Sequence, residues 1–102
     1  MIQTKESDVT KTVREAVVKA AEKGEDMAVS TKEISRNVMK NAISKIEPTK
    51  ENIEETVRDI VKGVAAGANE AGLEVKELTG KAVEGAVPPK LRSLLEMPQM
   101  FP

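Results

Sequence analysis

Apolar residues recur at helical spacing along most of the chain and form a single stripe. In the second half the stripe comprises Ile53, Val57, Ile60, Val64, Ala68, Ala71, Val75, Leu78, Ala82 and Ala86. In the first half it comprises Val9, Val13, Ala16, Ala20, Met27, Ile34, Val38 and Ala42. It is weakest at Gly24 and Thr31, and its spacing fits an 11-residue repeat of about three helical turns. Such a stripe buries against another helix, so the pattern predicts an all-α protein.

The two halves of the chain also resemble each other. Residues 6–43 align with residues 50–87 without a gap, and residues 12–15 then lie over the similar residues 56–59. Any two amphipathic helices in phase share apolar positions, so a true duplication and a shared helical period explain the alignment equally well. Under both explanations the halves are helical segments of equal length.

The clearest interruption of the helical pattern lies at residues 47–49. Pro48 disfavours the helical conformation at the residue before it and lacks a backbone N–H donor. The chain must therefore fold back there, and Pro88 with Pro89 ends the helical region in the same way. The predicted parts are a disordered N-terminus (1–6), a helical domain (7–87) and a proline-flanked apolar tail (88–102).

Two stretches with glycines, residues 24–30 and 67–72, have two interpretations. Gly24 offers a helix stop, and residues 30–33 have the capping-box form that begins a new helix at Thr31. The apolar stripe nevertheless keeps its phase through both stretches, which a loop has no reason to preserve. We therefore expect an antiparallel hairpin of two long helices, residues 7–46 and 50–87, that pairs with another chain into a four-helix arrangement. The alternative is a compact single-chain four-helix bundle with loops at both stretches.

The composition suits one small domain with a thin core. The chain has 102 residues and is 39% hydrophobic, but it contains a single Phe and no Trp or Tyr. Val and Ala bury less area than aromatic residues, so either the helices approach closely or chains pair, and a homo-oligomer is expected. Sixteen basic and 17 acidic residues are mixed along the chain, and this pattern argues against nucleic-acid binding.

Candidate reaction chemistry is sparse. The chain has no Cys and no His, so it lacks a thiol nucleophile, thiolate or imidazole metal ligands and the commonest general base. No carboxylate pair forms a recognisable catalytic constellation, so we expect no enzyme activity, cofactor or metal. A polar N-terminus and the absence of a long apolar run predict a cytoplasmic protein without a secretory signal or membrane span.

A ladder of small residues is the first candidate site. Gly63, Gly67 and Ala71 are spaced so that helix backbones can approach closely. The ladder is either an ordinary packing seam or, if functional, an oligomer contact. If Gly67 lies inside a helix, its replacement by alanine is expected to be tolerated.

The tail is the second candidate site, because it gathers the largest apolar side chains. These are Leu91, Leu94, Leu95, Met97, Met100 and Phe101. Such a peptide can anchor in the groove of a partner protein. A tail that folds back to cover the open end of its own bundle explains the same residues, and both interpretations stay open.

These observations predict a non-enzymatic helical scaffold or accessory protein that acts through protein–protein association. The alternative is an amphipathic protein that binds lipid or a hydrophobic granule, since basic residues flank the apolar stripe. Over residues 7–87 the aromatic-free, Ala- and Val-rich composition is similar to that of phasins and late-embryogenesis-abundant proteins. This similarity is compositional, and no motif of either family is present.

Overall fold

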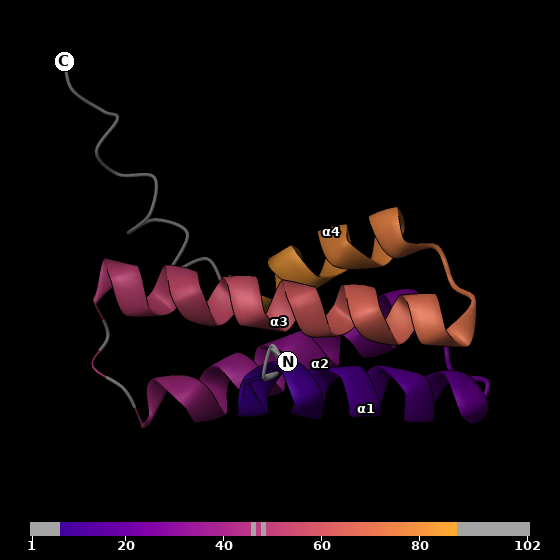
Figure 1. Cartoon of the computed structure of the whole chain (residues 1–102), viewed down its shortest axis with the longest axis horizontal. Helices are drawn as coiled ribbons and strands as arrows, with labels where there is room; N and C mark the ends of the chain where they lie inside the picture. Colours follow the sequence, from indigo (N-terminus) through magenta and orange to yellow (C-terminus); the bar gives the residue numbers. More distant parts are fainter. Residues whose placement is uncertain (1–6, 46, 48, 88–102) are drawn as a thin grey trace, which may run out of the picture.

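The computed structural model describes residues 7–45, 47 and 49–87. These residues form four helices and no strand: α1 (Asp8–Glu22), α2 (Met27–Ile43), α3 (Lys50–Ala71) and α4 (Val75–Ala86) (Figure 1). The predicted all-α class and four-helix arrangement are confirmed, and all four helices belong to one chain. The expected disordered N-terminus, Pro48 and the apolar tail lie outside the described residues.

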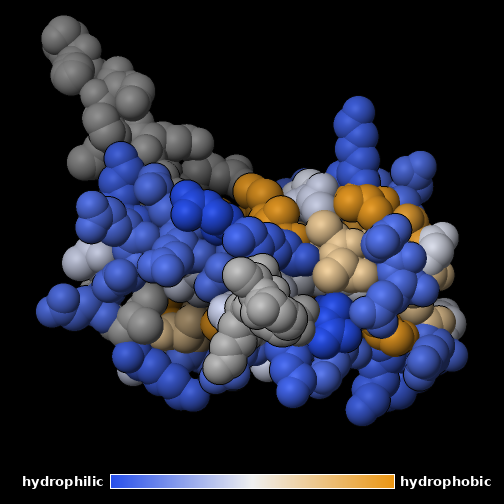
Figure 2. All heavy atoms as spheres, viewed as in Figure 1, coloured by the Kyte–Doolittle hydropathy of each residue, from blue (hydrophilic) through white to orange (hydrophobic). Residues whose placement is uncertain are grey.

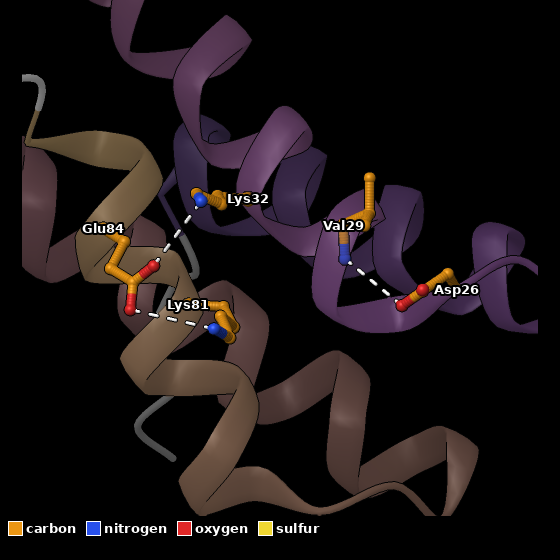
Figure 3. Close-up of polar contacts among 5 residues, drawn as sticks. All are labelled: Asp26, Val29, Lys32, Lys81 and Glu84. Carbon is orange, nitrogen blue, oxygen red and sulfur yellow. Dashed lines mark hydrogen bonds and ion pairs between the residues drawn. The ribbon is translucent and has the colours of Figure 1, made fainter.

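Polar side chains cap the start of three helices. Ser7 accepts a hydrogen bond from the backbone N–H of Thr10, and Thr49 accepts one from Asn52. Asp26 accepts from the backbone N–H of Ala28. It also accepts from the backbone N–H of Val29 (Figure 3). Each cap satisfies N–H groups that have no partner inside the helix.

The predicted start of the second helix at Thr31 is wrong. α2 begins four residues earlier, because Asp26 provides an N-cap before Met27. The capping-box sequence at residues 30–33 therefore lies inside α2, where Ser30 donates a hydrogen bond to the Glu25 carboxylate at 2.6 Å. The capping-box signature alone therefore does not fix where this helix begins.

Two glycines in the left-handed conformation separate the helices of each half. Gly24 has φ +74° and Gly72 has φ +72°, a region that other residues rarely adopt. After α1 the backbone N–H of Glu25 bonds to the carbonyl of Ala20, and after α3 the N–H of Leu73 bonds to the carbonyl of Ala68. These bonds satisfy carbonyls at the helix ends, as glycine-terminated helices commonly do.

The expectation of two long helices, residues 7–46 and 50–87, is therefore wrong. Residues 24–30 and 67–72 each contain a real helix end, and the alternative of a compact single-chain bundle is the arrangement observed. The phase of the apolar stripe does not reveal these helix ends, because both turns are only a few residues long. The next helix then begins with an apolar residue, Met27 or Val75, that continues the stripe.

The helices pair in an order that continuous helices could not achieve. α1 and α3 run in the same direction, and α2 and α4 run back (Figure 1). The most extensive contacts join α1 to α3 and α2 to α4. Between α1 and α3, the Thr10 hydroxyl donates to the carbonyl of Asp59 at 2.9 Å and Arg14 pairs with Glu70 at 3.2 Å. α1 can lie parallel to α3, and α2 parallel to α4, only because the chain turns at Gly24 and Gly72. The predicted antiparallel hairpin of two long helices is therefore not formed.

The core contains most of the predicted stripe from the second half of the chain. Its buried apolar members include Ile53, Ile60, Val64, Ala68, Leu78, Ala82 and Ala86. Val13 and Val17 of α1 complete this region from the other side. α1, α3 and α4 therefore supply most of the buried apolar residues.

The buried face of α2 differs from the prediction. It comprises Ser30, Thr31, Ser35 and Met39, of which Thr31 and Ser35 are fully buried. Ile34 and Val38 of the predicted stripe are only half-buried. Because polar residues occupy the centre of this face, the aliphatic residues of α2 lie at its edge.

Burial places the two halves in a different register from the sequence alignment. In the gap-free alignment, buried Val13 lies over half-buried Val57, and buried Met39 lies over exposed Val83. A register shifted by three residues matches five pairs of buried positions: Val13 with Ile60, Val17 with Val64, Thr31 with Leu78, Ser35 with Ala82, and Met39 with Ala86. Duplication of one half stays a prediction.

We expect the chain to be mainly helical in dilute buffer, because its caps, turns and core are completed within one chain. Far-ultraviolet circular dichroism checks this. A coil spectrum that becomes helical only with lipid or trifluoroethanol would contradict the expectation and favour the surface-active alternative.

Candidate protein-association surfaces

The predicted seam of small residues lies between two helices of the same chain. A Cβ atom added to Gly63 would lie 2.6 Å from the carbonyl oxygen of Thr10 and 2.7 Å from the Cβ of Val13. Gly63 and Gly67 are buried against α1, whereas Ala71 is half-buried at the end of α3. The close approach therefore joins α1 to α3 and leaves these two glycines no exposed surface for an oligomer contact.

The expectation that alanine is tolerated at Gly67 is wrong for this geometry. Gly67 lies inside α3 with no positive φ, as expected for a helical residue. Its added Cβ would nevertheless lie 2.8 Å from the Cβ of Val17 and 2.9 Å from the carbonyl oxygen of Arg14. Helix propensity favours alanine here, but the separation between the helices excludes it.

A third glycine permits the other close approach. An added Cβ on Gly85 of α4 would overlap the carbonyl oxygen of Lys32 in α2. The sequence did not indicate Gly85, because the residues four positions before and after it, Lys81 and Pro89, are not small. A single glycine is enough where two helices cross at one point.

An open groove separates α1 from α2 near the start of α1 and the end of α2. We call it the α1–α2 groove, with a volume of about 310 Å³, and its lining residues are Asp8, Val9, Thr12, Val38, Asn41, Ala42 and Lys45. Val9, Val38 and Ala42 are half-buried, and the other four are exposed. The groove therefore has an aliphatic floor with polar edges that include one acidic and one basic side chain.

A second groove lies between α2 and α4. We call it the α2–α4 groove, with a volume of about 270 Å³, and its lining residues are Arg36, Met39, Lys40, Ile43 and Gly85. Met39 is 2% exposed and Ile43 is half-buried, so the floor is apolar. Arg36 and Lys40 are exposed on the same helix and place two positive charges beside that floor.

The remaining surface carries scattered apolar residues and weak ion pairs. Val29 and Val83 are 51% and 42% exposed, and on the face seen in Figure 2 apolar atoms form small, separate patches between polar side chains. Near Val29, Glu84 pairs with Lys32 at 3.6 Å and with Lys81 at 3.8 Å (Figure 3). Exposed pairs of this kind contribute little to stability, so the contact of α2 with α4 depends mainly on apolar packing and Gly85.

The described part of the chain offers no cluster of three or more acidic side chains suited to a metal ion. None of its helices is both long enough and apolar enough to cross a membrane. The six tail residues proposed for protein binding, from Leu91 to Phe101, lie outside the described residues.

Comparison with protein-family models, with curated proteins and with solved structures finds no match to this chain.

Sequence reasoning placed the aliphatic floor of the α1–α2 groove in the core. The missed signal is the pair of polar residues at helical spacing in α2, Thr31 and Ser35. Their burial turns Val38 and Ala42 towards the edge next to α1, where both remain half-buried.

Proposed function

We propose that this protein is a non-enzymatic helical scaffold or accessory protein that acts by association with another protein chain. The observation that carries this proposal is the α1–α2 groove, whose aliphatic floor is open to solvent on an otherwise compact bundle. A groove between two helices is a suitable site for the apolar side of a third helix.

Other half-buried aliphatic residues of α2 belong to the same apolar stripe as Val38 of the groove. Met27 and Ile34 of α2 are half-buried and pack at the edge of the core. An added helix would remove Met27, Ile34 and Val38 from water, at about 25 cal/mol per Å² of apolar area. These residues are already half-buried and have only part of their apolar area left to bury, so the free energy available is modest and suits reversible association.

The expected occupant is a second copy of the chain. Asp8 and Lys45 give the groove edges opposite charges, so the same surface on two copies can be self-complementary, as an isologous dimer requires. The thin core predicted from the composition does not by itself require an oligomer, since Gly63 and Gly67 let α1 approach α3 closely within one chain. The groove now supports the proposal.

We expect Thr12→Arg to weaken self-association at least about tenfold. Thr12 is exposed and lines the groove, so a long charged side chain there obstructs a partner without entering the core. Asn37→Arg is the matched control, because it adds the same charge to an exposed position of α2 outside the groove. Sedimentation equilibrium of the wild type and both variants over micromolar concentrations measures the effect.

Equal weakening by both substitutions would assign the effect to net charge and refute the groove as the contact. A wild-type protein that stays a monomer of 11.0 kDa at all concentrations would refute self-association. Affinity purification from the native cell would then decide between a different protein partner and a lipid or granule surface.

A further inference from the structure

The α2–α4 groove lies beside the point where the chain leaves the bundle. α4 ends at Ala86, and the next residue, Val87, is 7% exposed and belongs to the core. Gly85, only two residues earlier, lines the groove. The segment that follows Val87 therefore starts next to an open apolar surface.

The sequence of this segment matches the groove in chemistry and reach. Leu91, Leu94 and Leu95 have the spacing of one helical face, and Glu96 follows them directly. Leu91 is four positions after Val87, and four residues of extended chain span at most about 14 Å. The leucines suit the apolar floor formed by Met39 and Ile43.

The two positively charged side chains at the groove have no acidic partner in the described part of the bundle. Arg36 and Lys40 are four residues apart on α2, so they lie on neighbouring turns of one face. Within residues 7–87, as far as they are described, neither cation has an ion-pair partner. A carboxylate at the end of a leucine-containing segment would complement them.

We propose that residues 91–96 dock in the α2–α4 groove of their own chain, with the leucines on Met39 and Ile43 and Glu96 near Arg36 and Lys40. The short connection gives the segment a high effective concentration at the groove, which favours it over a free peptide. Docking covers the apolar floor and makes the tail part of the bundle. This inference does not depend on the α1–α2 groove, so the two proposals can fail separately.

Disulfide cross-linking of the full chain tests the proposal, because the protein contains no cysteine of its own. The test pair is Ile43→Cys with Leu94→Cys. The matched control is Ala42→Cys with Leu94→Cys, since Ala42 is the adjacent residue of α2 but lines the α1–α2 groove. In a glutathione redox buffer, the test pair should form a disulfide within one chain. The effective concentration of its two thiols should be at least about tenfold higher than that of the control pair.

Similar intrachain effective concentrations for the test pair and the control pair would overturn the proposal. The absence of a cross-link between Ile43→Cys and Leu94→Cys would overturn it as well. An interchain bond to Ile43→Cys would overturn it in favour of a second copy as the occupant.

Thermal unfolding gives an independent measurement. Leu95→Glu should lower the Tm by about 5 °C or more, because a charge replaces a buried leucine, whereas Gln99→Glu adds the same charge outside the docking segment and should leave the Tm unchanged. A Tm that Leu95→Glu does not change would also refute docking.

Discussion

Replacing Gly63 by alanine is expected to lower the free energy of unfolding by about 2–3 kcal/mol. The added Cβ would lie 2.6 Å from the carbonyl oxygen of Thr10 and 2.7 Å from the Cβ of Val13. Both atoms are fixed within α1, so the strain is relieved only if α1 moves away from α3. That movement would separate the most extensive helix contact of the fold. Urea denaturation followed by circular dichroism measures the change.

Gly80→Ala is the matched control for this substitution. Gly80 lies inside α4, is exposed, and has no atom within 4 Å of an added Cβ. Alanine should therefore stabilise the protein there by up to about 1 kcal/mol through helix propensity alone. A neutral or stabilising Gly63→Ala would show that α1 and α3 lie further apart than described.

The second large effect should be a gain in stability. Thr31 and Ser35 are fully buried on α2, and neither hydroxyl has a hydrogen-bond partner among the residues that the structure describes. An unpaired buried hydroxyl costs about 1–3 kcal/mol, since it loses its hydrogen bonds to water. Thr31→Val keeps the side-chain shape and should raise the free energy of unfolding by about 1–2 kcal/mol. Adding Ser35→Ala should raise it further, to a total of about 2–4 kcal/mol, because alanine also favours the helix.

Thr10→Val is the same change of residue type as Thr31→Val, but it is expected to lower the free energy of unfolding. Thr10 is 7% exposed, and its hydroxyl donates to the carbonyl of Asp59 at 2.9 Å and accepts from Ser7 at 3.0 Å. Removing these bonds should cost about 1 kcal/mol. Chemical denaturation of Thr10→Val and Thr31→Val under identical conditions compares them. Equal destabilisation would mean that the Thr31 hydroxyl is satisfied in solution.

The helical class and much of the core could be predicted because apolar period is a local property of the sequence. Leu78, Ala82 and Ala86 recur at helical spacing and are buried in α4. The helix ends could not be predicted from phase, since a short turn at Gly24 lets the stripe continue in register. Left-handed glycine and a preceding helix cap are the local features that decide the turn.

Helix pairing and the candidate surfaces depend on distant contacts. The small-residue ladder indicated a close approach at Gly63, but nothing in its spacing showed that the neighbour would be α1 of the same chain. The α1–α2 groove depends on burial of Thr31 and Ser35, and polar residues are ordinarily expected at the surface. Only the packed structure shows that these hydroxyls displace aliphatic residues to the edge.

The pairing of α1 with α3 has a consequence for how the chain folds. The Thr10–Asp59 and Arg14–Glu70 hydrogen bonds join residues 49 and 56 positions apart. The extensive α2–α4 contact likewise crosses from one half to the other. Loop-closure entropy must be overcome before such contacts stabilise the chain, and folding rates fall as contact order rises. The protein should therefore fold more slowly than helical bundles stabilised by neighbouring hairpins, with its nucleus formed where the two halves meet.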